Sequence, residues 1–254
     1  MTDRILSHSL SAERPLQVGM IVLQTDETIE RDFRRLMPPE VEYLVTRVPF
    51  EAFVTPGALA AMEGRIADAA KLLPPAAAFD CVAYCCTSAS AQIGLARVGN
   101  ILHGAVQTRR VTNPASALIA ACRHLGLSRL ALLSPYSEEV STRLREVIAE
   151  NGVETPVFGS FEVIEDARVV RIDTESILNG ARTLLRTAEA DGLFLSCTNL
   201  RTLDVIAPLE AELGLPVLSS NQVLAWHMLS LSRGGATPSA PGRLFRSDPA
   251  YADP

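Results

Sequence analysis

Residues 79–90 read Phe-Asp-Cys-Val-Ala-Tyr-Cys-Cys-Thr-Ser-Ala-Ser, and residues 191–199 read Asp-Gly-Leu-Phe-Leu-Ser-Cys-Thr-Asn. Each stretch is a short apolar run that ends in Cys-Thr and a small polar residue, which is typical of a buried strand followed by a turn. Cys86 and Cys197 occupy matching places in the two stretches and lie 111 residues apart. Two thiols at the ends of corresponding strands predict one site shared by two similar halves of the chain.

The elements around the two cysteine strands repeat in the same order. In the first half the pattern predicts further strands at 16–23, 41–48 and 102–106, and helices at 28–36, 56–73, 91–98 and 115–125. In the second half it predicts further strands at 130–133, 157–164 and 216–218, and helices at 138–151, 175–190, 203–213 and 221–231. Strands that alternate with helices indicate βαβ units and parallel sheets. The predicted fold class is therefore α/β, with two pseudo-symmetric lobes that each hold a parallel four-stranded sheet flanked by helices.

The repeat also predicts where the lobes begin and end. We expect a first α/β lobe over residues 16–114, completed by residues 220–232, and a second α/β lobe over residues 115–219. Residues 1–15 are polar, and the chain beyond Gly234 is rich in Pro, Ser and Ala. Such segments bury little apolar surface, so residues 1–15 and 234–254 are expected to be flexible arms.

Composition narrows the partners and the compartment. The 254 residues are 48% hydrophobic and 20% charged, with a formal net charge of -6, so an ordinary globular core is expected. An acidic chain without a basic block argues against nucleic acid as a partner. No apolar run approaches the ~20 residues that span a bilayer, and the first residues lack the apolar region of a signal peptide. We therefore expect a cytoplasmic protein without a membrane partner.

The cysteines and glycines argue against metals and nucleotide cofactors. The five cysteines are Cys81, Cys85, Cys86, Cys122 and Cys197. An odd count without a secretory signal indicates reduced thiols rather than disulfides, and the spacing of a zinc site is missing. Neither G-x-G-x-x-G nor a Walker A loop occurs. The sequence thus gives no support for a nucleotide cofactor and only weak support for a metal site, so we expect neither.

Polar residues gather where predicted strands end, which is where ligands bind in open parallel sheets. These residues are Gln24, Asp26, Cys86, Thr87, Ser88, Tyr136, Cys197, Thr198 and Asn199. Hydroxyls and the free N–H groups at helix starts form a cradle for an anion such as a carboxylate, and a helix N-terminus lowers the pKa of a thiol. Two thiols that face one carbon can act as acid and base, or as nucleophile and proton donor.

Structural explanations compete with these roles. Strand cysteines are usually core residues, and this explanation is preferred for Cys81, Cys85 and Cys122, whereas for Cys86 and Cys197 both explanations stay open. Tyr136 can be a half-buried turn residue, and Asp26 can simply cap a helix. Capping is also the preferred role of Asn113 and Asn221, and His103, His124 and His227 are expected to be structural.

The duplicated pattern, with Cys-Thr-Ser at 86–88 and Ser-Cys-Thr-Asn at 196–199, resembles the aspartate/glutamate racemase superfamily. Within it, the chain is most similar to the maleate cis-trans isomerase and arylmalonate decarboxylase branch. Residues 18–33, Val-Gly-Met-Ile-Val-Leu-Gln-Thr-Asp-Glu-Thr-Ile-Glu-Arg-Asp-Phe, look like the ectoine-utilisation protein A group, which occurs with enzymes of ectoine and hydroxyectoine breakdown. The resemblance covers residues 16–232.

The resemblance implies a cofactor-independent isomerase or racemase that acts on a small carboxylate, and it also implies a homo-oligomer. Cys86 and Cys197 would be the catalytic pair, while Thr87, Ser88, Tyr136 and the backbone of Thr198 would hold the carboxylate. Ectoine or hydroxyectoine degradation is the expected context. Maleate cis-trans isomerisation is one alternative, and a non-catalytic ligand-binding protein of the same fold is another. The decarboxylases keep only the second cysteine, so the presence of both argues against decarboxylation.

Two departures from the family pattern bear on the substrate. Leu23-Gln-Thr-Asp26 stands where maleate isomerases carry Pro-Ser-Ser-Asn, and Glu165-Asp166-Ala167 stands where they carry Glu-Asp-Asn. An acid at position 26 would repel a second substrate carboxylate. It would instead suit a cationic group, such as the cyclic amidinium of ectoine-type compounds.

Overall fold

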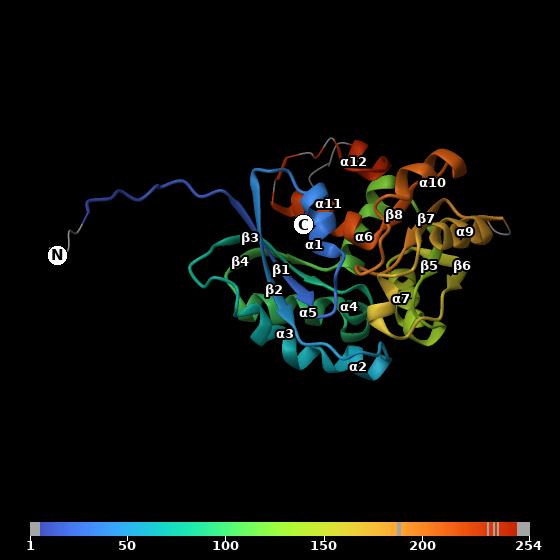
Figure 1. The fold of residues 1–254 in the computed structure, drawn as a ribbon, viewed down its shortest axis with the longest axis horizontal. Coiled ribbons are helices and arrows are strands. Elements are labelled where there is room, and N and C mark those ends of the chain that lie inside the picture. Colours follow the sequence, from blue (N-terminus) through green and yellow to red (C-terminus); the bar gives the residue numbers. More distant parts are fainter. Residues whose placement is uncertain (1–5, 187–188, 233, 236, 238, 248–254) are drawn as a thin grey trace.

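The computed structural model describes residues 6–186, 189–232, 234–235, 237 and 239–247 (Figure 1). Eight strands form two four-stranded parallel sheets. The first has the order β2-β1-β3-β4 and consists of β1 (Leu16–Leu23), β2 (Val41–Val48), β3 (Phe79–Cys85) and β4 (Thr108–Thr112). The second has the order β6-β5-β7-β8 and consists of β5 (Arg129–Ser134), β6 (Glu154–Ser160), β7 (Gly192–Leu195) and β8 (Val217–Ser219). The predicted fold class is confirmed, and we call the parts around the two sheets the first and second lobes.

Helices connect the strands and cover the sheets. Those up to the start of the second sheet are α1 (Ile29–Leu36), α2 (Pro56–Ala61), α3 (Glu63–Ala70), α4 (Thr87–Ile93), α5 (Leu95–Ala105) and α6 (Pro114–Leu125). The later ones are α7 (Glu138–Glu150), α8 (Asp166–Val169), α9 (Thr174–Leu185), α10 (Ile206–Leu213), α11 (Ser220–Ser232) and α12 (Arg243–Arg246). In the first lobe, α3 and α5 pack on one side of the sheet, and α1 and α11 lie on the other (Figure 1). Because both faces are covered, residues 18–23 and 81–85 of the central strands are buried without alternation.

Both sheets share a feature that creates a crevice. The strand order reverses between β1 and β3 in the first sheet and between β5 and β7 in the second. Loops that leave such neighbouring strands diverge to opposite faces, which opens a ligand crevice at the carboxyl ends of the strands. The loops after β1, β3, β5 and β7 carry almost all the polar residues that the sequence analysis singled out.

One predicted strand is wrong. Residues 102–106 were expected to form the fourth strand, but residues 102–105 belong to helix α5, in which Val98 and Leu102 form the buried face. The fourth strand is β4, at the edge of the sheet, where Arg109 and Arg110 are exposed. An edge strand with two arginines lacks the apolar run that marks a central strand, which explains the error.

The two predicted asparagine caps differ. Asn113 caps α6, because its Oδ1 accepts the Ser116 N–H at 2.9 Å, and Gly126 ends that helix at φ 69°. Asn221 is not a cap, since α11 already begins at Ser220 directly after β8. Its Nδ2 instead donates to Thr198 O at 2.8 Å.

Helix α11 joins the lobes. It follows the last strand of the second sheet but packs on α6, β3 and α1. The division at residues 114 and 115, with 220–232 completing the first lobe, stays a prediction, as does the homo-oligomer. Across the described ranges, no helix has the length and apolarity needed to cross a membrane.

The two ends of the chain, where flexible arms are expected, differ from each other in structure, and their flexibility stays a prediction. Residues 6–14 are exposed and run away from the first sheet (Figure 1), whereas α12 lies within the expected C-terminal arm. In it Leu244 is buried, and the Arg243 N–H donates to Glu210 Oε1 at 2.9 Å. The sequence did not predict this contact. Residues 1–5, 236, 238 and 248–254 of the expected arms, and 187–188 of the predicted helix 175–190, lie outside the described residues.

Candidate active site

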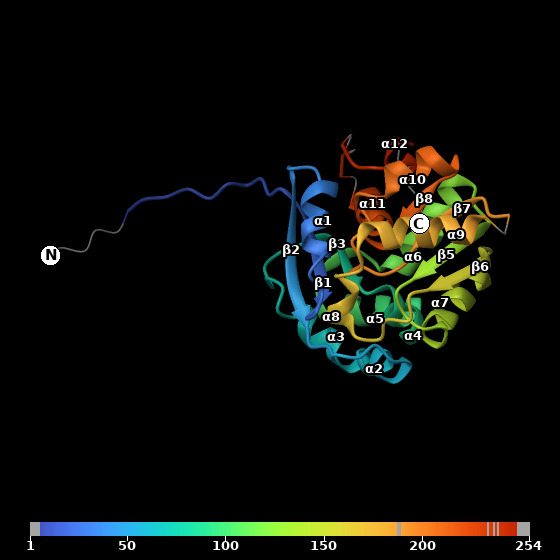
Figure 2. The ribbon, with the colours of Figure 1, turned by 45° about the vertical axis from the view of Figure 1, so that its right-hand side comes forward.

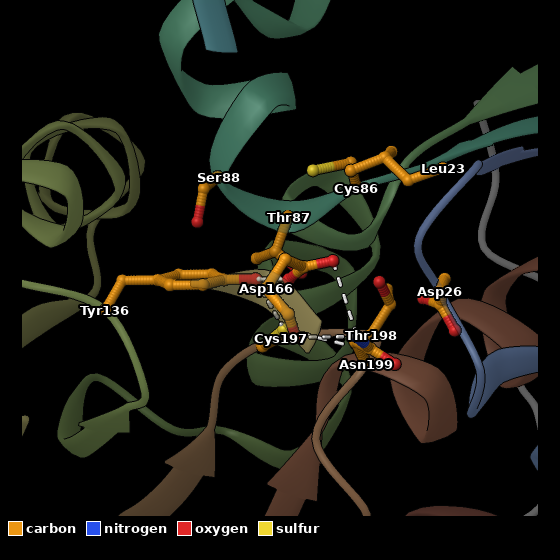
Figure 3. Close-up of a pocket in the computed structure, with 10 residues that line it drawn as sticks. All are labelled: Leu23, Asp26, Cys86, Thr87, Ser88, Tyr136, Asp166, Cys197, Thr198 and Asn199. Carbon is orange, nitrogen blue, oxygen red and sulfur yellow. Dashed lines mark hydrogen bonds between the residues drawn. The ribbon is translucent and has the colours of Figure 1, made fainter. Parts of the chain in front are cut away.

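A small pocket lies where the loops at the carboxyl ends of the two sheets meet (Figure 3). It is lined by Leu23, Asp26, Cys86, Thr87, Ser88, Tyr136, Asp166, Cys197, Thr198 and Asn199. The structure therefore brings together the two cysteines and all but one of the other predicted site residues. The cavity has about 10 Å³ of space, enough for about one water molecule. A larger ligand enters only if the surrounding loops move apart.

Gln24 is the predicted residue that does not line the pocket. Its side chain is exposed, and its N–H pairs with Val48 O at 2.9 Å. This pairing continues the strand geometry of β1, in which successive side chains point to opposite sides. Leu23 lines the pocket in its place.

Cys86 stands at the junction of β3 and α4. Its side chain is buried, which raises the pKa of the thiol to about 12, although the backbone N–H groups of Ala89 and Ser88 act in the opposite direction. The charges of Asp166 and Asp26 raise the pKa further. The sequence analysis expected the helix start to favour a thiolate, but burial outweighs that effect in the closed pocket. Cys86 therefore rests as a neutral thiol.

Cys197 has an unusual backbone. Its φ is 104°, in the left-handed region that favours glycine. Two hydrogen bonds hold the chain there: Cys197 N–H donates to Ser220 Oγ at 3.0 Å, and Ser196 N–H donates to Leu133 O at 2.9 Å. Strained residues of this kind cluster at functional sites, where the surrounding structure fixes them.

The strain at Cys197 leads to a stability prediction. Cys197→Gly is expected to be more stable than Cys197→Ala by about 1 kcal/mol or more, because only glycine adopts this φ at little cost. Both variants lose the thiol, so the comparison isolates the backbone. Urea unfolding of the two variants measures the difference. Equal stability would mean that this backbone conformation is not strained.

The Cys197 sulfur touches two hydrogen-bonding groups. The Tyr136 hydroxyl lies 3.0 Å away, and the Asn199 N–H donates to the sulfur at 3.3 Å. Burial and then the charge of Asp166 raise the pKa of Cys197 well above its ordinary range, against the opposing effect of Tyr136 and Asn199. This thiol thus has partners that stabilise a thiolate, in surroundings that disfavour a second negative charge.

Asp166 is a pocket residue that the sequence analysis did not assign to the site. Its Oδ1 accepts the Tyr136 hydroxyl at 2.8 Å, and its Oδ2 accepts the Thr25 hydroxyl at 2.5 Å. It begins α8, and the segment before it crosses to the first lobe, where Glu165 pairs with Phe53 and Asp166 N–H donates to Ala52 O at 3.1 Å. Figure 2 shows α8 near the end of β1, where the Thr25 hydroxyl reaches Asp166. The one signal in the sequence was the altered motif at residues 165–167.

Ser220 is a second residue near the two cysteines that the sequence did not predict as part of the site. Its Oγ accepts the Thr87 hydroxyl at 2.8 Å and the Cys197 N–H at 3.0 Å, so one hydroxyl links the two cysteine loops. The Thr198 hydroxyl donates to Cys85 O at 3.3 Å in the same contact between lobes. The hydroxyl of Ser88, by contrast, has no hydrogen-bond partner within the described ranges and remains available to a ligand.

The Asn199 side chain connects the two lobes through hydrogen bonds. Its Oδ1 accepts the Glu27 N–H at 2.9 Å, and its Nδ2 donates to Thr25 O at 3.4 Å and Asp166 O at 3.3 Å. Both ends of the amide are thus engaged with the protein. Asn199 therefore lines the closed pocket, but its amide group is not free to bind a ligand.

Asp26 combines the two roles that the sequence left open. Its Oδ1 accepts the Thr28 and Ile29 N–H groups at 2.8 Å and so pairs two N–H groups at the start of α1, whose N-cap residue is Thr28. Its Oδ2 is buried and accepts no hydrogen bond of normal geometry within the described part of the chain, although the Thr198 side chain acts to lower the pKa of this carboxyl. Burial is the main cause that raises the pKa of Asp26, and none of the ten lining residues is Lys, Arg or His. A cationic ligand group would find a counter-charge here.

A buried carboxylate outside the pocket lining, Asp32, makes stability depend on pH. Its Oδ2 accepts Asn221 Nδ2 at 2.9 Å, and burial raises its pKa from 3.8 to about 6. Below pH 3.8 both the folded and the unfolded chain hold this proton. As the pH rises to about 6, only the unfolded state releases it fully, so the free energy of unfolding falls.

Asp32→Asn tests this effect. Relative to the variant, the wild type is expected to lose about 2 kcal/mol of stability between pH 4 and pH 7. Urea unfolding of both proteins at several pH values gives the difference, in which other titrating groups cancel. A difference that stays constant over this range would contradict the prediction.

Comparisons of the sequence and of the fold with known proteins identify similar enzymes. The family model described as arylmalonate decarboxylase matches residues 18–245. The arylmalonate decarboxylase of Bordetella bronchiseptica is 34% identical over 137 residues, which span 53% of this chain and 57% of that protein. The maleate isomerase of Nocardia farcinica is 28% identical, with 92% of this chain and 97% of that protein covered. A solved structure of the Nocardia farcinica maleate cis-trans isomerase, a cysteine-to-serine mutant with a covalently bound succinylcysteine intermediate, superposes with a TM-score of 0.80 at 26% identity over 92% of this chain and 99% of that chain.

Proposed function

Since the chain belongs to the arylmalonate decarboxylase family, we propose that it is a cofactor-independent isomerase or racemase of a small carboxylate that works through Cys86 and Cys197. One observation carries the proposal: a cysteine from each lobe lines the same closed pocket. The succinylcysteine intermediate of the Nocardia farcinica relative supports cysteine chemistry on such a fold. Cys86 directly follows the last residue of β3, and Cys197 lies two residues beyond the end of β7, so the central strands of the two sheets position both thiols.

Two reaction types use this pair. In racemisation, the thiolate of one cysteine removes the proton from the carbon beside the carboxylate, and the thiol of the other delivers a proton to the opposite face. In cis-trans isomerisation, one sulfur adds to the alkene while a proton is supplied, the C–C bond rotates, and elimination restores the alkene and the thiolate. We propose that Thr87, Ser88, Tyr136 and the Thr198 backbone hold the carboxylate, with Ser88 the hydroxyl already free for it.

For the substrate, we propose a carboxylate that also carries a cationic group, as the cyclic amidinium of ectoine or hydroxyectoine does. The buried Oδ2 of Asp26, which accepts no hydrogen bond of normal geometry in the described chain, supports a cationic group, and Asp166 adds a second acid to a pocket without basic lining residues. The similarity of residues 18–33 to the ectoine-utilisation group points to the same compounds. Maleate is the second candidate, favoured by the maleate isomerases among the relatives.

Proton exchange tests the proposal. The protein is incubated in heavy water with ectoine, hydroxyectoine or maleate, and NMR follows deuterium uptake and the appearance of an isomer. We expect uptake or isomerisation with a cation-bearing carboxylate. Conversion of maleate alone would replace the preferred substrate by the second candidate. Tight binding without any exchange or conversion would instead indicate a ligand-binding protein.

A further inference from the structure

Three side chains of the pocket lie in a hydrogen-bonded row. Cys197 Sγ lies 3.0 Å from the Tyr136 hydroxyl, which lies 2.8 Å from Asp166 Oδ1. Figure 3 shows the Tyr136 ring reaching across the pocket with its hydroxyl between the other two groups. A tyrosine hydroxyl has a single hydrogen and can also accept, so it cannot donate to both neighbours at once.

We propose that Asp166 takes up the Cys197 proton through the Tyr136 hydroxyl and returns it by the same route, so that this thiol changes charge without exchanging a proton with water. The proposal rests on the proposed function, in which Cys197 must alternate between thiol and thiolate. Asp166 acts through Tyr136 and is therefore a positioning residue for the proton.

The row has two arrangements that differ only in the places of two protons. In the first, Cys197 S–H donates to the Tyr136 oxygen, and Tyr136 O–H donates to the Asp166 carboxylate. In the second, the S–H bond has broken and its proton is on the tyrosine oxygen, while the original tyrosine proton is on Asp166 Oδ1. Tyr136 then donates to the thiolate. The row carries one negative charge in both arrangements, and no other reactant is needed.

The surroundings of Asp166 suit this exchange. Its other oxygen accepts hydrogen bonds from the Thr25 hydroxyl at 2.5 Å and from Asn199 Nδ2 at 3.4 Å, so the carboxyl group is fixed in orientation. Oδ1 faces only Tyr136 among its hydrogen-bond partners in the described chain. Proton transfer along such a row needs this kind of fixed geometry.

Charge favours transfer of the proton to Asp166 over its loss to water. The negative charge of Asp166 is one of the causes that raise the pKa of Cys197, after burial. Once Asp166 holds the proton, that repulsion is gone and the Asn199 N–H at 3.3 Å faces the thiolate. Losing the Cys197 proton to water would instead leave two negative charges in a buried pocket. Among the residues that the structure describes, Cys86 has no such row, since the hydrogen bonds that oppose its high pKa come from the backbone N–H groups of Ala89 and Ser88.

The reactivity of Cys197 without any substrate tests the proposal. The protein is treated with iodoacetamide across neutral pH, and mass spectrometry of the digested chain gives a rate constant for each cysteine. Because only the thiolate is alkylated, internal transfer predicts a Cys197 rate that is nearly independent of pH. In Asp166→Asn and Tyr136→Phe the proton must leave to water, and the rate is expected to rise about tenfold per pH unit. Asp32→Asn removes a buried carboxylate outside the row and is expected to keep the wild-type profile.

The same spectra contain an internal control. Cys85 is fully buried and reports opening of the whole fold, so Cys197 is expected to be alkylated faster than Cys85. A wild-type Cys197 rate that rises about tenfold per pH unit, a rate no faster than that of Cys85, or a pH-independent rate kept by Asp166→Asn would each overturn the proposal. The alkylation assay contains no substrate, so it tests the proton transfer separately from turnover. If Cys197 alkylation were independent of pH but the protein converted no substrate, the proton-transfer proposal would stand and only the proposed enzyme function would be contradicted.

Discussion

Replacing Cys86 or Cys197 with alanine is expected to lower kcat/KM for the carboxylate substrate by at least about 10³-fold, or about 4 kcal/mol of transition-state stabilisation. Each reaction type needs one sulfur as base or nucleophile and the other as proton donor. A methyl group does neither. Steady-state rates from the NMR assay of the wild type and the two variants measure the loss.

The double variant separates a pair that acts together from two independent contributions. If the thiols cooperate in one reaction, removing the second costs little more than removing the first, because catalytic units are strongly non-additive. Cys85→Ala is the matched control, since Cys85 precedes Cys86 in the chain but is buried away from the pocket lining. It is expected to lose stability and keep turnover.

The single variants also distinguish the two chemistries. If a sulfur adds to an alkene, the variant that keeps that sulfur but lacks the second thiol must take the proton from water and lacks the group that removes it during elimination. It is therefore expected to accumulate a covalent adduct, seen as a mass increase of one substrate molecule. Racemisation by proton transfer leaves no adduct. Full activity in either variant would remove the cysteines from the mechanism.

The fold was predictable where strands are central and apolar. β1 and β2 were placed with their observed bounds, because parallel strands covered on both faces show as continuous apolar runs. The same logic failed at β4, where Arg109 and Arg110 mark an exposed edge, and it assigned the apolar face of α5 to a strand. The apolar pattern of a sequence reflects which residues are buried, so the prediction of strands and helices is least reliable where an element is half exposed.

The pocket was predictable because the ends of parallel strands converge. Cys86, Tyr136, Cys197 and Asp26 each follow a strand, and that rule alone gathers them. Asp166 and Ser220 follow no such pattern: one begins a four-residue helix after a crossing segment, and the other follows a three-residue strand. Their roles come from contacts between lobes, which depend on how the two halves dock rather than on either local sequence.

Asp26→Asn is expected to lower kcat/KM for a cation-bearing carboxylate by about 100-fold or more, since it removes a buried partner charge, and to leave maleate unaffected or improve its binding. Asparagine keeps an Oδ1 for the Thr28 and Ile29 N–H groups, so the hydrogen bonds at the start of α1 survive while the charge at Oδ2 disappears. Isothermal titration of hydroxyectoine and maleate into wild type and variant, beside the turnover assay, measures this change in preference.

Stability separates a change of preference from damage to the fold. Burial raises the pKa of Asp26, so the ionised carboxylate costs folding free energy at pH values above its folded-state pKa. Asp26→Asn removes this cost and is expected to unfold at a higher temperature than the wild type near neutral pH. Glu210→Gln is the control, because it alters a buried carboxylate that is bonded to Arg246 and does not line the pocket. It is expected to lower stability and to leave the ratio of the affinities for hydroxyectoine and maleate unchanged. If Asp26→Asn weakened the binding of hydroxyectoine and of maleate equally, Asp26 would not recognise a cationic group. Any preference for a charged ring over a dicarboxylate would then have to come from other residues of the pocket.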